Sequence, residues 1–210
     1  MADTAPDVNR RSKGEQTRHR ILAEARRVLV AEGYDAVVLR AVADCVGIKL
    51  GNLQYYFPTR DDLLLAVMTH EAATDIEDIR AVSDEQRAPF DVLTNVVDVL
   101  VTKWRSDSGT VLATLGFMRM HKPDFEAAYR TIYAAFYEEI EQAIERVAPS
   151  LPADEYRRRA RLLTALIDGA SMQVDVGPRA HYVESVTHAA MRIALGHDDT
   201  VAASSAPDEA

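Results

Sequence analysis

The 210-residue chain lacks the segments that mark several specialised classes of protein. Its single cysteine, Cys45, excludes an internal disulfide and is typical of a protein of the reducing cytoplasm. No run of about 18 uncharged apolar residues occurs, so we expect no membrane-spanning helix. The first residues, MADTAPDVNRR, are not followed by an apolar segment, so we expect no secretory signal.

Positive charge is also scarce overall, but it is unevenly distributed. The net charge is −9 at pH 7. Residues 10–60 hold ten Lys and Arg against five Asp and Glu, whereas residues 61–210 hold fourteen Lys and Arg against twenty-six acids. A basic region is attracted to nucleic-acid phosphates and an acidic one is repelled. The distribution therefore favours DNA binding by one region over an architectural protein that coats DNA nonspecifically.

Apolar residues recur at helical spacing, and no alternating strand pattern of any length occurs. The predicted fold class is therefore all-α, with about nine helices. A long first helix is predicted behind Ser12, which forms a capping box with Glu15. The later helices are predicted over residues 60–80, 87–106, 109–120, 123–147, 153–175 and 182–195. The small, polar ends, 1–11 and 197–210, are expected to be disordered tails.

Two short helices joined by a glycine are predicted within residues 12–60. The first has an apolar face formed by Leu39, Val42, Ala43 and Val46. Gly47 interrupts it, and a second short segment, Lys49 to Tyr55, follows before Pro58. Two short helices joined in this way are typical of a helix-turn-helix. We expect residues 12–60 to be a DNA-binding domain and residues 61–196 to be a second domain.

Residues 33–64 also contain a series of fixed steps at fixed spacing: Gly33-Tyr34, Leu39-Arg40-Ala41-Val42-Ala43, Gly47-Ile48, Gly51-Asn52-Leu53, Tyr56-Phe57-Pro58, Arg60 and Asp61-Asp62-Leu63. This series resembles the DNA-binding signature of the TetR family of bacterial transcription regulators. The resemblance implies a homodimer that binds double-stranded DNA at an inverted-repeat operator and is released by a small organic effector. Repression is the more frequent mode in that family, and activation or dual regulation is the alternative.

The second short helix is expected to enter the major groove of DNA. Leu53 and Phe57 are four residues apart and are predicted to face the core. The other residues of this segment are predicted to face DNA, and the family resemblance adds positions that contact a base or a phosphate. Together the predicted DNA-binding residues are Arg40, Lys49, Leu50, Gly51, Asn52, Gln54, Tyr55, Tyr56, Thr59 and Arg60. Asn52 and Gln54 have side chains that pair with adenine, and Leu50 can contact a thymine methyl.

Three positions depart from the family pattern. Val37 and Val38 replace the usual Ser or Thr that caps the helix and contacts phosphate, so we expect Asp35 to cap it instead. Lys49 stands at a frequent Ser position and has no oxygen with which to cap. Gln54 replaces a frequent Tyr and is expected to contact a base.

Cys45 has two interpretations. It is either a small buried residue or a redox sensor, and the absence of closely flanking basic residues favours burial.

The resemblance implies that the last two helices, 153–175 and 182–195, form the dimer interface. The sequence Leu162–Ala170 is similar to the family's apolar-Asp-Gly step, and its small residues allow close helix approach. The predicted interface residues are Leu163, Leu166, Ile167, Gly169, Ala170, Val186, Ala190 and Ile193. The alternative is that these apolar faces pack within one subunit.

Aromatic and sulfur-bearing residues of the second domain are candidates for an effector pocket, and the alternative for each is an ordinary core position. They are Trp104, Phe117, Met118, Met120, His121, Tyr129, Tyr133, Phe136 and Met172. Such a set favours an uncharged or weakly polar organic effector.

Catalysis is the rival function from another class. None of the six histidines belongs to an HExxH motif or forms a close i, i+4 metal pair. No P-loop, G-x-S-x-G or dinucleotide-binding motif is present. We therefore expect neither an enzyme nor a bound metal or cofactor.

Overall fold

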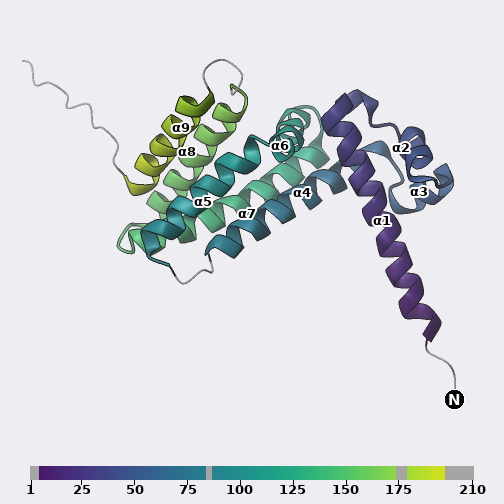
Figure 1. Ribbon diagram of the computed structural model, residues 1–210, viewed down its shortest axis with the longest axis horizontal. Helices are drawn as coiled ribbons and strands as arrows, with labels where there is room; N and C mark the ends of the chain where they lie inside the picture. The colour runs from purple at the N-terminus through teal and green to yellow at the C-terminus, as the bar shows by residue number, and fades with distance from the viewer. Residues whose placement is uncertain (1–4, 84–86, 174–178, 197–210) are drawn as a thin grey trace, which may run out of the picture. The chain divides into compact units, whose positions relative to one another are not determined.

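The computed structural model describes residues 5–83, 87–173 and 179–196, and within them it contains only helices (Figure 1). The all-α fold class and the expected number of helices are confirmed. The helices are α1 (Ala5–Glu32), the 3₁₀ helix η1 (Tyr34–Ala36), α2 (Leu39–Val46), α3 (Leu50–Tyr56), α4 (Arg60–Ser83), α5 (Pro89–Trp104), α6 (Asp107–Met118), α7 (Pro123–Val147), α8 (Ala153–Ser171) and α9 (Arg179–Leu195).

Prolines explain why several helix starts follow from the sequence. Pro89 and Pro123 are the first residues of α5 and α7, and Pro152 is the N-cap of α8. Proline is tolerated in the first helical turn because the N–H that it lacks would have no partner within the helix. The start of the first helix differs from the prediction, because α1 begins at Ala5. Ser12 is therefore an interior residue of α1 rather than its N-cap.

The sequence predicts disordered tails at residues 1–11 and 197–210, and the structure describes only residues 5–11 of them. Residues 1–4 and 197–210 lie outside the described residues, whereas residues 5–11 are helical.

Contacts divide the chain into two compact units, which do not coincide with a division at residue 60. The unit that we call the head contains residues up to Asp75 together with Ser106–Tyr133. The unit that we call the body contains Ile76–Arg105 and the chain from Ala134 onward. Helix α6 belongs to the head because it packs against α1. Apolar periodicity does not reveal such pairing of distant segments.

The head has its core between α1 and the short helices. Within α1, the apolar face is buried: Ile21, Leu22, Ala25, Val28 and Leu29. This face packs against η1 and α2, and α2 packs against α3 (Figure 1). Burial of large aliphatic side chains stabilises such an arrangement by about 1.5–3 kcal/mol for each. The core therefore holds the two short helices in a fixed orientation.

The body contains a group of three mutually contacting helices, α5, α8 and α9 (Figure 1). Trp104 of α5 is buried and packs edge-on against Phe136 of α7, with ring centroids 5.9 Å apart. Among the helices that the structure describes, none is long and apolar enough to cross a membrane.

Candidate nucleic-acid interface and ligand pocket

The turn between α2 and α3 depends on one glycine. Gly47 caps α2 in the left-handed conformation, with φ 75° and ψ 37°. The N–H of Ile48 then donates to the carbonyl of Ala43 over 3.0 Å. Left-handed backbone favours glycine because it has no Cβ. The predicted helix-turn-helix is therefore present, with Gly47 as its turn residue.

Helix α3 separates buried from exposed residues as the sequence predicts. Leu53 and Phe57 are buried, and the guanidinium of Arg18 lies 5.4 Å from the centroid of the Phe57 ring. Five of the predicted DNA-binding residues in and next to this helix are exposed: Lys49, Gly51, Asn52, Gln54 and Tyr55. Leu50 and Tyr56 are half-buried. Contact of this face with DNA remains a prediction.

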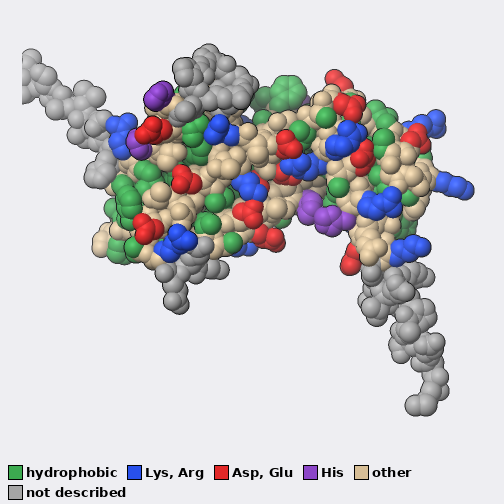
Figure 2. Space-filling view, viewed as in Figure 1, with side chains coloured by type: hydrophobic (Ala, Val, Ile, Leu, Met, Phe, Trp, Pro, Cys, Tyr) green, Lys and Arg blue, Asp and Glu red, His purple; other side chains and the backbone are tan. Residues whose placement is uncertain are grey.

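The exposed face of α3 has a polar and basic surrounding. Tyr55 is 81% exposed, and Arg40 of α2 is exposed as well. On the face shown in Figure 2, Lys and Arg side chains project from the region of α2 and α3. Such a surface suits contact with phosphates on either side of a groove.

Arg60, which the sequence places at a phosphate, is bound inside the head. Its Nε donates to the carbonyl of Val37 over 2.7 Å, and a terminal nitrogen donates to the carbonyl of Tyr34. The guanidinium also lies over the Tyr34 ring, 3.9 Å from its centroid. Arg60 therefore joins the start of α4 to the turn that precedes α2, and it holds that turn in place.

Thr59 and Asp62 form a capping box at the start of α4. The backbone N–H and the hydroxyl of Thr59 donate to Asp62 Oδ2 over 3.0 and 2.7 Å. The N–H of Asp62 lies 3.1 Å from the Thr59 hydroxyl oxygen. Reciprocal bonds of this kind satisfy two backbone donors that the first helical turn leaves free. Thr59 is exposed, and its side chain caps α4 whether or not it also contacts DNA.

At Val37, Val38 and Lys49, where the sequence departs from the family pattern, the structure shows how the helices begin. Val37 is fully buried, whereas Val38 is 50% exposed and occupies the N-cap of α2 without a side-chain bond. The prediction that Asp35 caps α2 is therefore wrong, because the N-cap residue is Val38 and no side-chain hydrogen bond caps the helix. Lys49 is the N-cap of α3 and makes no side-chain cap bond, as expected.

A second ionic contact supports the start of α4. Lys122, in the turn between α6 and α7, lies 2.5 Å from Asp61 Oδ2. Its hydrogen bond to Asp61 raises the pKa of the Lys122 ammonium above the ordinary value. The start of α4 is therefore held by Lys122 as well as by its own cap.

Buried polar groups connect α1, α4 and α6 within the head. Arg26 binds Glu71 through two nitrogens, with N–O distances of 2.6 and 2.8 Å. The Ser108 hydroxyl lies 2.5 Å from Glu71 and 3.2 Å from Asp75, and it donates its proton to the nearer Glu71. Pairing with Glu71 raises the pKa of Arg26. The sequence gives no sign of this network because its members lie far apart in the chain.

The interpretation of Cys45 as a buried residue is wrong, since its side chain is exposed. Local desolvation, followed by the neighbouring Glu24 carboxylate, raises the pKa of the Cys45 thiol. A raised pKa lowers the reactive thiolate fraction, which argues against a redox sensor as well.

The residues predicted as one effector pocket are distributed over both units. In the head, Tyr129 and Tyr133 stack with ring centroids 4.0 Å apart, and Phe117 contacts His121 while remaining 58% exposed. Met118 is buried there, and Met120 is exposed. The body contains the other three: Trp104, Phe136 and Met172. Met172 is 79% exposed, so it is not part of a closed cavity.

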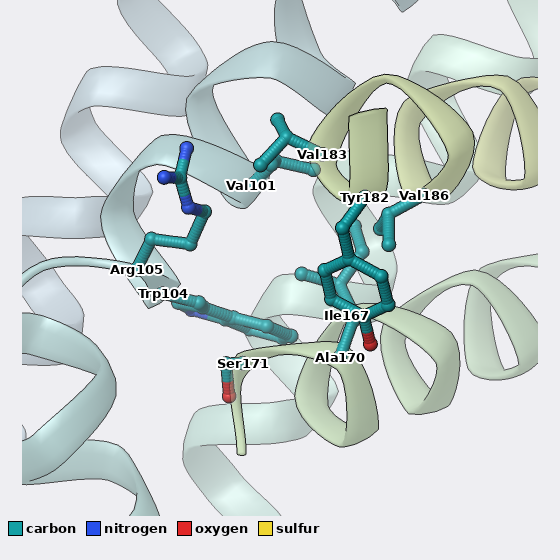
Figure 3. A pocket seen from close by; sticks show the side chains of 9 residues that line it. All are labelled: Val101, Trp104, Arg105, Ile167, Ala170, Ser171, Tyr182, Val183 and Val186. Carbon is teal, nitrogen blue, oxygen red and sulfur yellow. The ribbon is translucent and has the colours of Figure 1, made fainter. Parts of the chain in front are cut away.

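The body contains a different pocket, where α5 and α8 end and α9 begins (Figure 3). The cavity itself is small, about 10 Å³, and a volume of about 240 Å³ is reached only when the open mouth is counted. Of the predicted pocket residues, Trp104 lines it. The other residues that line it are Val101, Arg105, Ile167, Ala170, Ser171, Tyr182, Val183 and Val186. The sequence assigns Ile167, Ala170 and Val186 to the dimer interface instead, because the same apolar spacing is typical of helix packing.

Most of the predicted dimer residues are covered by their own chain. Leu163, Ile167, Ala170, Val186 and Ala190 are buried where α8 and α9 contact each other and α5. The alternative of packing within one subunit therefore holds for these five. The remaining three are only half-buried: Leu166, Gly169 and Ile193.

Comparisons with known proteins agree with this geometry. Residues 21–67 match the model of bacterial regulatory proteins of the tetR family, and residues 89–196 match that of the C-terminal region of BetI-type transcriptional repressors. The HTH-type nicotine-responsive transcriptional repressor HdnoR of Paenarthrobacter nicotinovorans is 25% identical over 167 residues, 77% of this chain and 84% of that protein.

Two solved structures resemble the fold. A TetR transcription regulator from Haloarcula marismortui has a TM-score of 0.73 at 22% identity, and the match covers 86% of this chain and 97% of that one. A regulator from Saccharomonospora viridis in complex with choline has a TM-score of 0.71 at 22% identity, covering 84% and 94%. The matching proteins are transcription regulators rather than enzymes.

Proposed function

Because the chain belongs to the TetR family and is a DNA-binding transcription regulator, we propose that it is a homodimeric repressor of an inverted-repeat operator. Helix α3 enters the major groove, and a small organic molecule releases the protein from DNA. The protein acts where the chromosome is, in the cytoplasm. Residues 12–60 provide DNA binding, and residues 61–196 provide effector binding and dimerisation.

The observation that supports DNA reading most strongly is the division of α3 into two faces. Leu53 and Phe57 are buried, so the rotation of α3 about its axis is fixed. Asn52 and Gln54 are then held outward as potential base contacts. Arg40, Lys49, Tyr56 and Thr59 are proposed to contact phosphate or flanking groups, and Arg60 supports them from within the head.

A gel-shift comparison tests this proposal. Fragments of the protein's own promoter region and random DNA of equal length compete for binding at moderate salt, because nonspecific affinity is largely electrostatic. We expect the promoter fragment to bind at least about a thousandfold more tightly. Equal affinity for both would contradict a sequence-specific regulator.

Dimerisation is proposed through the outer face of α8 and α9. Leu162 is 43% exposed, Ala165 is exposed, and Leu166 and Gly169 are half-buried. These four residues follow helical spacing on one side of α8. A Cβ placed on Gly169 would meet no atom within 4 Å, so a partner helix can approach closely there. This stripe replaces the buried residues Leu163 and Ile167 in the proposed interface.

An effector is proposed because two relatives are described with small molecules. HdnoR is described as nicotine-responsive, and the Saccharomonospora viridis structure contains choline. A ligand acts only through different affinities for the DNA-bound and free states. Helix α4 runs without interruption from the head into the body, so it is the proposed connection between an effector and DNA.

A further inference from the structure

Two histidines from different helices of the head meet at its surface. His19 of α1 and His70 of α4 lie with their ring centroids 5.0 Å apart and their ring planes perpendicular. Both side chains are exposed. Figure 2 shows histidine side chains gathered at the surface between α1 and α4. Sequence spacing gives no sign of this pair, because its members lie on separate helices far apart in the chain.

The charged side chains next to this pair in the sequence are directed to other partners. The guanidinium of Arg18 lies against a buried aromatic ring, and Arg20 donates to a carbonyl at the end of α2. Glu71, which follows His70, is buried and paired with an arginine of α1. Among the described residues, no hydrogen bond or ion pair occupies the imidazole of His19 or of His70. Their ring nitrogens are therefore accessible to an added ligand.

The separation of the two rings matches that of two ligands on one metal ion. A metal–nitrogen bond of about 2.0–2.1 Å places the centre of an imidazole ring about 3.2 Å from the ion. Two such rings have centres about 5.2 Å apart at a tetrahedral angle and about 4.5 Å apart at a right angle. The observed 5.0 Å lies between these values. Rotation of a ring about its metal–nitrogen bond does not change this separation, so perpendicular planes are compatible with a shared ion.

We propose that His19 and His70 together bind one divalent transition-metal ion of the kind that prefers imidazole, such as Ni²⁺, Cu²⁺ or Zn²⁺. Within the described part of the chain, no third His, Cys, Asp or Glu joins the pair, so water completes the coordination. The ion joins α4 to α1, which packs against the helix-turn-helix. This site goes beyond the proposed regulation and does not depend on it.

Calorimetric titration of the full-length protein, without an affinity tag and without DNA, measures this binding. Ni²⁺ is the probe, and Mg²⁺, which prefers oxygen ligands, is the comparison. We expect one tightly bound Ni²⁺ per chain and no binding of Mg²⁺. With Ni²⁺ at about a hundred times its dissociation constant, Tm should rise by about 5–10 °C, because the ion binds the folded chain and not the unfolded one.

Each histidine is replaced in turn, and a third exposed histidine serves as the control. His19→Ala and His70→Ala should each weaken Ni²⁺ binding at least about tenfold, since even the loss of a group that supports a ligand has that effect. Each should also reduce the rise in Tm by about half or more at the same Ni²⁺ concentration. His121→Ala, at another exposed position of the head, should change neither quantity. Helical circular dichroism verifies the fold of all three variants.

Three results would overturn the assignment. They are the absence of Ni²⁺ binding, an unchanged affinity in His19→Ala or His70→Ala, and one ion for every two chains, which would place the ion between molecules. Without an ion, the two rings are an edge-to-face contact only. Because DNA takes no part in these titrations, their outcome is separate from that of the gel-shift test of regulation.

Discussion

Replacement of Arg60 by alanine distinguishes support of the DNA-binding helices from contact with DNA itself. The change removes hydrogen bonds to the carbonyls of Val37 and Tyr34 and the contact with the Tyr34 ring. A hydrogen bond from a charged group contributes about 1.5–3 kcal/mol. The Arg60 side chain is 32% exposed, so solvent screening reduces this contribution. We expect the free energy of unfolding to fall by about 2 kcal/mol.

Thermal unfolding and salt-dependent DNA binding measure the two roles separately. A loss of about 2 kcal/mol lowers Tm by about 4–8 °C in a chain of this length. At temperatures where the variant is folded, the slope of the logarithm of DNA affinity against the logarithm of salt concentration should be unchanged, because no phosphate contact is lost. Arg40→Ala is the matched control, since Arg40 is exposed on α2. It should reduce the slope by about two, one phosphate contact for each subunit of the dimer, and leave Tm unchanged.

The result that would refute this account is an Arg60→Ala variant with an unchanged Tm and a salt slope reduced by about two, one for each subunit. That outcome would make Arg60 a phosphate ligand, as the sequence alone suggests.

Three further predictions concern base reading, dimerisation and acid stability. Asn52→Ala should relax base preference at one operator position by about 1–3 kcal/mol, measured by binding to single-base operator variants; an unchanged preference would exclude it as a base contact. Leu162→Asp should give a monomer in light scattering, whereas Phe90→Asp, at a similarly exposed residue, should stay dimeric, and a dimeric Leu162→Asp would exclude the α8 stripe. Arg158 and Arg159 lower the pKa of Glu155 to about 2, so its stabilising contribution is present above about pH 4.5 and is lost as pH falls toward 2. Glu155→Gln should therefore make Tm less sensitive to pH over that interval, and an identical pH profile would contradict the pairing.

The helices were predictable from the sequence to the extent that local rules determine them. The 3.6-residue spacing locates α7 at Pro123–Val147, as predicted, because proline starts the helix and the apolar stripe continues to its end. The end of α8 is at Ser171 rather than at residue 175. The C-cap is Met172 rather than a glycine or proline, so the sequence carries no stop signal at that residue.

In the candidate site, the sequence predicts which residues are buried. It does not predict which distant residues contact one another. Leu53 and Phe57 are buried because of their spacing, which also places Asn52 outward. The role of Arg60 depends on carbonyls more than twenty residues earlier in the chain. Likewise, an apolar face on α8 does not reveal its partner: Leu163 is covered by the chain itself, whereas its neighbour Leu162 remains exposed.

The central claim is that α3 reads a DNA sequence, and selection of bound DNA from a random pool tests it most directly. Purified full-length protein and the Asn52→Ala variant are each taken through the same rounds of selection at moderate salt. The account predicts that the unaltered protein enriches an inverted repeat with half-sites about one helical turn or a multiple apart. The variant should enrich the same repeat with one position relaxed in each half-site. Pools that remain unenriched, or that converge on a sequence without two-fold symmetry, would contradict it.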